Sequence, residues 1–397
     1  MKRPRIALVT NGLEGAGGGI RRWTEFLYRA FEDSDRFEVE VVSIATSSRD
    51  SASRRILKPS SWLRPVAVTG GSFHGIEFRH AGANFVEIEF QRYRSRPELT
   101  RVLSEYDLIQ FVVGFASWGC VASGLTRPIV MLVATTARAD RRSRVRASPL
   151  PRRAWLTAMG WIAERYERRA LAFADQVIVP SEYTLAGVRP LTRPGRIQIG
   201  FPGVDTDRMK PRDGVMRHGI LTVGRFDDPR KNLALLLRAY RRLPETAPIL
   251  RVVGETPEHL RALTADLGIK DRVEFVGRVD DQTLYELYAS SALLVVSSDE
   301  EGLSIVIQEA MAFGLPVVST DCGGPSTMVA QGVTGRLTPV GDDEALANEI
   351  RATLENPVQM QAMGAAARAF AEEHFATQRA ALTFASVWEE SLAVKQP

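Results

Sequence analysis

The sequence predicts an α/β protein built from two Rossmann-like, doubly wound domains. Short apolar segments alternate with amphipathic segments throughout the chain, and this alternation is typical of parallel sheets covered by helices. The length of 397 residues also exceeds what one hydrophobic core usually supports. A stretch rich in Gly and Pro at 200–211 separates two halves with the same pattern, so we expect domains over 1–200 and 201–376.

The first half begins with the apolar run 5–10, which is typical of a buried parallel strand. In the segment that follows, Ile20, Trp23, Leu27 and Ala30 recur at helical spacing and predict an amphipathic helix. The rest of this half predicts a second amphipathic helix and four more strands. The helix covers 161–174, and the strands cover 38–45, 107–114, 128–134 and 176–181.

The second half repeats the pattern from residue 218. Its predicted strands cover 218–224, 248–254, 272–277, 292–298 and 315–320, with a helical pattern after each of them. Open parallel sheets bind ligands beyond the carboxyl ends of their strands. We therefore expect functional residues in loops that follow strands, around a cleft between the two domains.

The composition excludes several classes of protein. Only two cysteines, Cys120 and Cys322, are present, so neither a disulfide framework nor a zinc spacing is available and a cytoplasmic location is expected. The five histidines form no cluster, so no metal and no other cofactor is expected. Residues 108–126 carry no charge, but they contain polar side chains and glycines. A strand, a buried helix and a second strand explain them better than a membrane span.

Charge is divided unevenly along the chain. Residues 1–200 hold 31 Lys and Arg against 19 Asp and Glu, a net charge of +12, whereas the remainder has a net charge of −8. The densest basic stretch, 137–153, contains seven Arg and one Asp and is typical of a solvated loop. A basic domain also attracts an anionic ligand or an acidic membrane surface. Nucleic acid is not expected, because the basic residues lack interleaved aromatic side chains.

The segment 11–19, NGLEGAGGG, joins the first predicted strand to the first predicted helix. It is not a dinucleotide fingerprint, since Ile20 stands at the position of the third Gly and the second strand does not end in an acidic residue. It also lacks the Gly-Lys-Ser/Thr of a P-loop. Two interpretations remain open: backbone N–H groups that hold an anion, or a turn that requires positive φ angles.

Cations follow the strand 218–224 in an unusual place. Arg225 lies in the loop, Asp228 and Pro229 predict the N-cap and first position of a helix, and Lys231 then falls in its first turn. A helix dipole disfavours a cation there, and a bound phosphate near Arg225 and Lys231 would compensate for it. The alternative is that both are ordinary surface cations.

Two carboxylates follow the strand 292–298. Glu301 lies in the loop, and Glu309 lies eight residues further on, about two helical turns, so both are expected on the same side. At that separation they do not form a coupled acid–base pair, but they suit two hydroxyl-rich groups of one extended ligand. The alternative is an exposed helix with acidic ends.

These features together resemble the retaining GT-B glycosyltransferases of family 4. The resemblance rests on Glu301-x₇-Glu309 with Arg225 and Lys231 upstream, and it is densest over 160–345. Four further stretches match the family: 166–184, 201–205, 272–279 and 323–342. The resemblance implies an N-terminal acceptor-binding domain, a C-terminal nucleotide-sugar domain, and a C-terminal helix, here 377–397, that packs back on the first domain.

The resemblance also implies roles for residues in the second domain. Arg225 and Lys231 would neutralise the departing diphosphate, and Glu301 would orient the donor sugar. The backbone of Gly302, Leu303 and Ser304 would help to orient this sugar. Glu309 would bind the ribose hydroxyls, and the backbone from Val276 to Arg278 would meet the base.

In the first domain, the resemblance implies that the amides of Gly18 and Gly19 approach the donor phosphate, and that Arg21 and Arg22 face the acceptor. The reaction implied is transfer of a hexose or N-acetylhexosamine from a nucleotide sugar, with UDP-sugars favoured over GDP-mannose, with retention and without a metal. The acceptor implied is a hydroxyl compound, anionic or lipid-linked, and the enzyme would be cytoplasmic, with peripheral contact to the inner face of the membrane.

The chain departs from the family at three places. Ala134 stands where many members have His, the sequence EGLS at 301–304 replaces the usual EGFG, and Thr327 replaces a common Glu. These changes leave the transferred sugar open. Two rival functions share the same ligand: a GT-B sugar-nucleotide epimerase, which needs paired acid and base side chains at the sugar, and a non-catalytic sugar-nucleotide-binding regulator.

Overall fold

The computed structural model describes residues 3–11, 13, 18–212, 214 and 216–394. The chain divides into two compact units, one formed by Met1–Gly203 with Thr377–Pro397 and the other by Val204–Ala376. The predicted division between residues 200 and 201 falls in the same connection. Each unit has an α/β fold built on one Rossmann-like sheet, as the alternation of apolar and amphipathic segments predicts.

The first unit contains, among the described residues, an eight-stranded sheet in the order β3-β4-β2-β1-β5-β6-β7-β8. All neighbouring strands are parallel except β3 and β4, which form an antiparallel hairpin at one edge. Its strands are β1 (Arg5–Thr10), β2 (Glu38–Ile44), β3 (Val68–Phe73), β4 (Ile76–Ala81), β5 (Leu108–Val113), β6 (Ile129–Val133), β7 (Gln176–Val179) and β8 (Ile197–Ile199).

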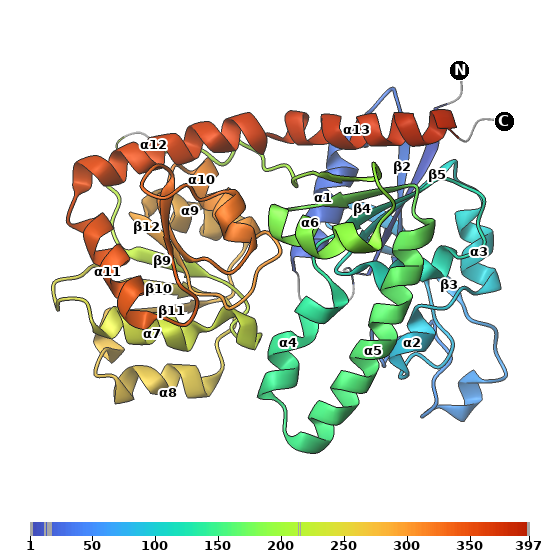
Figure 1. Ribbon diagram of the computed structural model, residues 1–397, viewed down its shortest axis with the longest axis horizontal. Helices are drawn as coiled ribbons and strands as arrows, with labels where there is room; N and C mark the ends of the chain where they lie inside the picture. Colours follow the sequence, from blue (N-terminus) through green and yellow to red (C-terminus); the bar gives the residue numbers. More distant parts are fainter. Residues whose placement is uncertain (1–2, 12, 14–17, 213, 215, 395–397) are drawn as a thin grey trace. The chain divides into compact units, whose positions relative to one another are not determined.

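Helices connect these strands and cover both faces of the sheet (Figure 1). The α-helices are α1 (Gly19–Phe31), α2 (Glu89–Arg92), α3 (Pro97–Leu103), α4 (Ala137–Ala147), α5 (Leu150–Phe173), α6 (Glu182–Val188) and α13 (Thr377–Val394). Three short 3₁₀ helices are η1 (Pro59–Ser61), η2 (Ala116–Ala122) and η3 (Arg189–Leu191).

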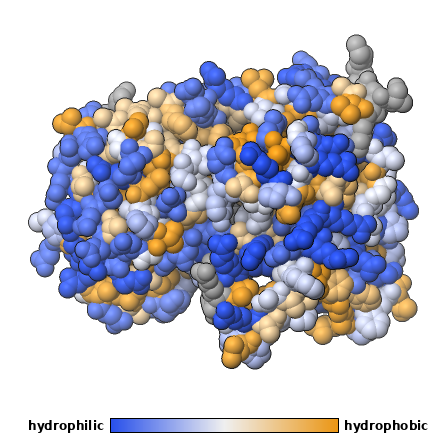
Figure 2. Space-filling view, in the orientation of Figure 1, coloured by the Kyte–Doolittle hydropathy of each residue, from blue (hydrophilic) through white to orange (hydrophobic). Residues whose placement is uncertain are grey.

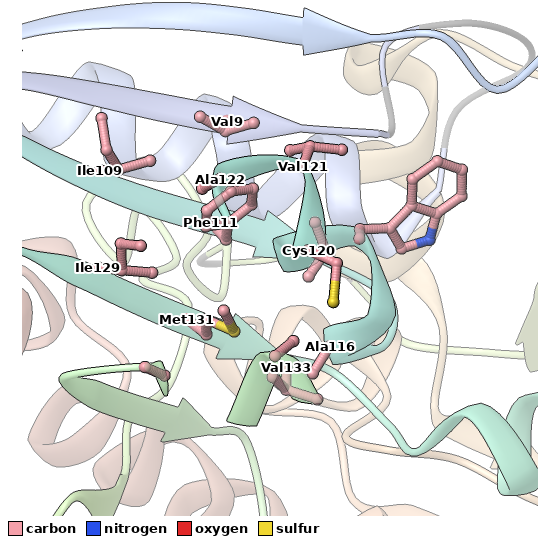
Figure 3. Close-up of a cluster of buried hydrophobic side chains, with 14 of the residues drawn as sticks. Val9, Ile109, Phe111, Ala116, Cys120, Val121, Ala122, Ile129, Met131 and Val133 are labelled. Carbon is pink, nitrogen blue, oxygen red and sulfur yellow. The ribbon is translucent and has the colours of Figure 1, made fainter. Parts of the chain in front are cut away.

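The core of the first unit lies between the central strands and the covering segments. Figure 3 shows Phe111 of β5 beside Ala122 of η2, in the same buried cluster as Met131 of β6 and Cys120 of η2. The uncharged stretch 108–126 is therefore β5 followed by a buried 3₁₀ helix, and β6 comes next. No helix in the described part of the chain is long and apolar enough to cross a membrane.

The basic stretch 137–153 is not the solvated loop that its composition suggests. It forms α4 and the beginning of α5. Thr136 caps α4, because its side chain accepts a hydrogen bond from the backbone N–H of Ala139. Arg is also a good helix former, so a dense run of arginines is compatible with a helix once the N-terminus is capped.

The second unit contains a six-stranded sheet among the described residues, parallel throughout, in the order β11-β10-β9-β12-β13-β14. Its strands are β9 (Ile220–Val223), β10 (Leu250–Val253), β11 (Val273–Gly277), β12 (Leu293–Val296), β13 (Val317–Thr320) and β14 (Gly335–Thr338). Its helices are η4 (Pro229–Lys231), α7 (Leu233–Arg241), α8 (Glu258–Asp266), η5 (Lys270–Arg272), α9 (Asp281–Ser290), α10 (Ile305–Ala312), η6 (Gly324–Thr327), α11 (Asp343–Leu354) and α12 (Pro357–His374).

Glycine allows the strands of the second unit to end close together. Gly254 follows β10 with a φ of +124°, and a Cβ atom there would lie 1.9 Å from the carbonyl oxygen of Gly224 after β9. Only glycine fits so close an approach. The loops that leave β9 and β10 therefore start side by side at the carboxyl edge of the sheet.

Helix α13 completes the first unit. Trp388 is fully buried against Phe31 and Phe37, and its indole Nε1 donates a 2.8 Å hydrogen bond to Oε1 of Gln110 in β5. Phe384, one turn earlier, packs edge-on against Trp23 of α1. Helix α13 is thus part of the same hydrophobic core as Trp23, Phe31 and Phe37, which are far from it in the sequence.

We expect Trp388→Ala to lower the free energy of unfolding by about 3–5 kcal/mol, because it leaves a large cavity and removes the donor to Gln110. Urea unfolding followed by circular dichroism measures this change. The matched control is Leu382→Ala on the same helix, where the side chain is exposed and a change below about 0.5 kcal/mol is expected. Equal effects of the two variants would contradict the assigned packing of α13.

Candidate functional site

Two loops at the carboxyl edge of the second sheet are tied together by hydrogen bonds. The backbone N–H of Asp299, after β12, donates to the carbonyl of Arg230, after β9, at 2.7 Å. The hydroxyl of Ser297 donates to the carbonyl of Lys231, and the amide of Asn232 donates to the Asp299 carboxylate at 2.7 Å. These bonds fix the loop 225–232 against the loop 297–301.

Lys231 and Glu301 meet where these loops join. Their Nζ and Oε1 atoms are 2.5 Å apart, and both side chains are partly buried. The same Oε1 also accepts a 2.7 Å hydrogen bond from the hydroxyl of Ser298. A charged pair with limited exposure needs such extra donors, because removal from water otherwise costs more than the attraction returns.

As predicted, Asp228 and Pro229 are the N-cap and the first position of a helix whose first turn holds Lys231. Asp228 does accept from the N–H of Arg230, but only the short 3₁₀ helix η4 follows it. Asn232 then adopts a left-handed conformation with a φ of +40°, and its side chain caps α7, which begins at Leu233. Lys231 therefore ends η4, just before α7, and the carboxylate of Glu301 compensates its charge.

Arg225 and Arg230 flank the carboxylate of Asp228. Arg230 Nη2 lies 2.6 Å from Asp228 Oδ2, whereas Arg225 is half-exposed and lies 3.8 Å from the same oxygen. Burial by itself would raise the pKa of Asp228, but the hydrogen bonds and charge of Arg230 lower it below its ordinary value. Arg230 thus neutralises Asp228, and Arg225 retains most of its freedom to meet another anion.

The expected helical alignment of Glu301 with Glu309 is wrong. Glu301 forms an isolated parallel bridge with Gly323, and α10 begins only at Ile305. Between them Ser304 has a φ of +83°, so the chain turns sharply before the helix. Spacing along one helix therefore does not relate the two carboxylates.

Gly302, Leu303 and Ser304 form the short connection from Glu301 to α10. Gly324 packs directly beneath it, and a Cβ atom at this glycine would lie 2.5 Å from the Cα of Leu303. Ser304 is buried, and its hydroxyl makes no hydrogen bond within the described residues. The close backbone approach of Gly324 thus sets the path of the residues predicted to orient the sugar.

Glu309 lies on the buried side of α10, with only 4% of its surface exposed. The hydroxyl of Tyr288 in α9 donates to its Oε2 at 2.9 Å, and the ring of Tyr288 stacks on Phe313. The alternative of an exposed helix with acidic ends is therefore excluded. The carboxylate instead has a fixed orientation, which Tyr288 and Phe313 maintain.

Val276 and Arg278 lie at the end of β11. The Arg278 guanidinium forms an exposed ion pair with Glu255, which follows β10. Val276 is half-buried in the strand. The structure brings these residues to the same carboxyl edge as Lys231 and Glu301, because β11, β10, β9 and β12 are successive parallel strands of one sheet.

In the first unit, much of the Gly-rich segment 11–19 lies outside the described residues. Gly18 is the extended residue before α1, and Gly19 is the first residue of the helix. The Arg21 guanidinium lies over the ring of Phe73 in β3, with 4.8 Å from its central carbon to the ring centre. Arg22 is half-buried on α1.

A cavity of about 430 Å³ lies after β6 and β7 in the first unit. Thr135 and Thr136 line it where β6 ends, next to Ala134. Thr184, which also lines it, donates its hydroxyl to the carbonyl of Ala134 at 3.2 Å. The remaining lining includes Arg138, Arg142, Glu164, Glu167, Arg168 and Tyr183.

Glu167 is the buried acid of this cavity. Its Oε1 accepts a 2.9 Å hydrogen bond from the backbone N–H of Ala137, at the start of α4. Burial raises the pKa of Glu167 to about 7, and the hydrogen bonds from Ala137 and Ala116 only partly oppose this shift. The residue therefore changes protonation near neutral pH.

Sequence reasoning missed Ser298, Tyr288 and Glu167. Ser298 lies only three residues before its partner Glu301 but belongs to no recognised motif, and Tyr288 was missed because its partner Glu309 is 21 residues further on. A signal for Glu167 was present, because Ala163, Glu167 and Ala170 recur at helical spacing and lie on one buried face. An acidic residue among apolar residues on one helical face is the sequence pattern that predicts a buried acid.

The described residues contain no group of three or more His, Cys, Asp or Glu side chains that would hold a metal ion. Both cysteines are free and buried, and burial raises the pKa of each thiol to about 12. That the protein works without a metal is a prediction from the sequence.

The two Rossmann-like units have the fold of the GT-B class of glycosyltransferases. Residues 17–208 match the family described as Glycosyltransferase Family 4, and residues 205–370 match the family described as Glycosyl transferases group 1. The chain belongs to the glycosyltransferases of family 4.

Curated relatives agree with this family. The D-inositol 3-phosphate glycosyltransferase of Mycobacterium sp. (strain KMS) is 30% identical over 330 residues, which cover 77% of this chain and 71% of that protein. The MMP alpha-(1->4)-mannosyltransferase of Mycolicibacterium hassiacum is 30% identical over 204 residues. That match covers 50% of this chain, and the chain spans only 50% of that relative's length.

Solved structures share the fold. The sucrose-phosphate synthase from Thermosynechococcus elongatus has a TM-score of 0.77 at 23% identity, with 99% of this chain and 100% of that chain covered. Anabaena HepE in complex with UDP-glucose has a TM-score of 0.73 at 20% identity, with 98% and 100% covered. At these identities the likeness concerns the fold.

We expect Gly324→Ala to displace the connection 302–304, because the new Cβ would overlap backbone atoms that have no room to move. The free energy of unfolding should fall by about 1–3 kcal/mol, and amide hydrogen exchange at 301–305 should accelerate. Gly70→Ala in β3 is the control, since nothing lies within 4 Å of its added Cβ. Unchanged exchange at 301–305 would contradict the described contact.

We expect Glu167 to make folding stability depend on pH. Its pKa in the folded protein, about 7, lies above the ordinary value of 4.5, so the folded state holds the proton more tightly. The contribution of Glu167 to the free energy of unfolding is therefore largest below about pH 4.5, and it falls by up to about 3 kcal/mol as the pH rises to 7. Glu167→Gln should flatten this slope in urea unfolding measured from pH 5 to 8.

The control is Glu77→Gln, which alters an exposed acid on β4 of the same unit. It should leave the slope as in the unaltered protein. If Glu167→Gln also leaves the slope as it is, the raised pKa of Glu167 is refuted.

Proposed function

We propose that the protein is a retaining, metal-independent glycosyltransferase. It transfers a hexose or N-acetylhexosamine from a nucleotide-diphosphate sugar to a hydroxyl acceptor in glycan, glycolipid or natural-product biosynthesis. The observation that carries the proposal is the Lys231–Glu301 pair at the carboxyl edge of the second sheet, with the half-exposed Arg225 on the same loop as Lys231.

The first argument is electrostatic. When the bond between sugar and diphosphate breaks, negative charge develops on the leaving phosphate, and fixed positive charge lowers the barrier. Lys231 has three N–H donors, of which Glu301 takes one, so the ammonium group has donors left for phosphate oxygens. Arg225 offers a planar guanidinium that binds two phosphate oxygens at once.

The second argument concerns the donor. Glu309 is a buried carboxylate, and such a group requires hydrogen-bond donors. Tyr288 supplies one of them, and the two hydroxyls of a ribose are suited to supply others. UDP-sugars are the first choice of donor, since a protein of the same fold is seen with UDP-glucose, and GDP-mannose is the second, since one relative is a mannosyltransferase.

The third argument concerns the acceptor. The cavity after β6 and β7 is lined by hydroxyls, including those of Thr135 and Thr136, and by the guanidinium groups of Arg138, Arg142 and Arg168. Hydroxyls and guanidinium groups together suit a polyol that carries a phosphate or carboxylate. We propose that the first unit holds an anionic acceptor in this cavity. The net positive charge of residues 1–200 would then attract the acceptor.

In the proposed reaction, the acceptor oxygen bonds to the anomeric carbon as the bond from that carbon to the diphosphate breaks. The pair of electrons leaves with the diphosphate, whose oxygen then takes the proton of the acceptor hydroxyl. Attack on the face that the diphosphate leaves retains the configuration. No side-chain base is needed, and Glu301 orients the sugar.

A donor screen that measures nucleotide release tests the proposal. Purified protein is mixed with UDP-hexoses, UDP-N-acetylhexosamines and GDP-mannose, and with soluble polyol phosphates, in the presence of a metal chelator. Release of nucleotide and a glycoside with the donor's anomeric configuration by NMR support transfer. An isomerised nucleotide sugar without a glycoside supports the epimerase, and binding without turnover supports the regulator.

We expect Lys231→Ala to lower kcat by about two to three orders of magnitude, because the leaving diphosphate loses a fixed positive charge. The thermal midpoint, measured in parallel, shows whether the variant folds. Lys270→Ala, which removes an exposed lysine of the same unit, is the control and should turn over normally. Near-normal turnover of a folded Lys231→Ala variant would refute the assignment of Lys231 to the diphosphate.

A further inference from the structure

Helices α4 and α5 form a hairpin whose far end stands away from the first sheet (Figure 1). Burial in α5 begins at Met159, and of the residues from Leu150 to Ala158 all are exposed except the half-buried Leu156. At the other end of the hairpin, Arg141 of α4 forms an ion pair with Glu89 of α2. The hairpin is thus anchored at its base and exposed at its tip.

Between Leu150 and Trp161, α5 has an exposed apolar stripe, although the exposed side of a helix is normally polar. Leu150, Ala154, Ala158 and Trp161 are spaced by four, four and three residues, so they form one stripe along the helix. This stripe lies opposite the buried stripe that contains Ala163, because all four residues are exposed. Leu150 and Trp161 are 79% and 78% exposed.

Trp155 enlarges this apolar surface at the tip. It is 61% exposed and lies five residues after Leu150, to one side of the stripe. Two tryptophans and a leucine exposed on one helix exceed the scattered apolar residues of an ordinary protein surface. Figure 2 shows the result as orange surface among blue at the lower edge of this unit, where the hairpin ends.

Arginines surround the apolar residues. Within the described part of the chain, Arg152 and Arg153 form no ion pair, and Arg144 approaches only Asp140, at 4.0 Å. Unpaired guanidinium groups beside exposed tryptophans leave a positive field over the tip. Structural arginines would be paired, as Arg141 is with Glu89.

We propose that the tip of the α4–α5 hairpin docks on the surface of an anionic lipid bilayer. Tryptophan and leucine side chains enter the boundary between headgroups and acyl chains, where an indole ring is most stable. The arginines bind lipid phosphates, each adding to the attraction. The hairpin lies on the membrane and does not span it. This inference goes beyond the transfer reaction and does not depend on it.

Co-sedimentation with vesicles tests the proposal. One set of vesicles contains equimolar phosphatidylcholine and phosphatidylglycerol, and the other contains phosphatidylcholine alone. We expect the full chain to sediment with the anionic vesicles, to remain in solution with the neutral ones, and to dissociate as salt rises. Its tryptophan emission should shift to shorter wavelength on binding, because Trp155 and Trp161 leave water.

Two variants separate the contributions of the tip. Trp155→Ser with Trp161→Ser should lower the partition coefficient by about tenfold or more and abolish the spectral shift. Arg152→Glu with Arg153→Glu should lower it by a similar or greater factor at low salt. None of these residues lies in the proposed transfer machinery, so nucleotide release with a soluble acceptor should be unchanged.

The controls carry the same chemical changes in the second unit. Met216→Ser with Val358→Ser removes two exposed apolar residues, and Arg238→Glu with Arg241→Glu reverses two exposed charges on α7. Both controls should bind vesicles as the unaltered protein does. Equal recovery with neutral and anionic vesicles, or equal losses in tip and control variants, would overturn the proposal. If the tip variants lost transfer to a soluble acceptor and kept vesicle binding, the hairpin would belong to acceptor binding and the membrane proposal would fail.

Discussion

The ion pair between Lys231 and Glu301 is the contact on which the arrangement of the second unit's loops depends. The two residues are 70 positions apart, and they meet because β9 and β12 are neighbours in a parallel sheet. Taking both charges partly out of water has a cost, which the short contact and the hydroxyl of Ser298 offset. With this pair in place, the loop that carries Arg225 and the connection from Gly302 to Ser304 leave the same edge of the sheet.

The two units handle charge in different ways. In the second unit, acids and bases near the strand ends neutralise one another, as Arg230 does Asp228 and Lys231 does Glu301. In the first unit, arginines at the hairpin tip lack such partners within the described residues, and those around the cavity are exposed. Paired charges position a site with little net field, whereas unpaired ones attract anions from a distance. This difference is why the first unit is proposed to meet an anionic acceptor and an anionic surface.

Local pattern predicted most of the fold and part of the site. The alternation of apolar and amphipathic segments predicted the central parallel strands of both sheets, because each of those strands is buried on both faces and reads as an apolar run. The sequence pattern did not predict the antiparallel hairpin of β3 and β4, because Gly70 and Gly71 interrupt the apolar alternation of β3 and this strand is largely exposed. The helix start at Asp228 and Pro229 was predicted correctly, but the helix ends after one 3₁₀ turn, because Asn232 adopts a left-handed conformation before α7 begins.

The sequence by itself determined which residues stand at the ends of strands, since a strand's apolar run and the glycine or charge that follows it are local features. It also determined the uneven division of charge. Only the tertiary structure decided which of these residues meet: Lys231 with Glu301, Glu309 with Tyr288, and Trp388 with Gln110. It likewise decided that Glu167 is buried and that Trp161 is exposed on the same helix. The physical reason is that such contacts depend on which strands and helices become neighbours, and that order is a property of the whole folded chain.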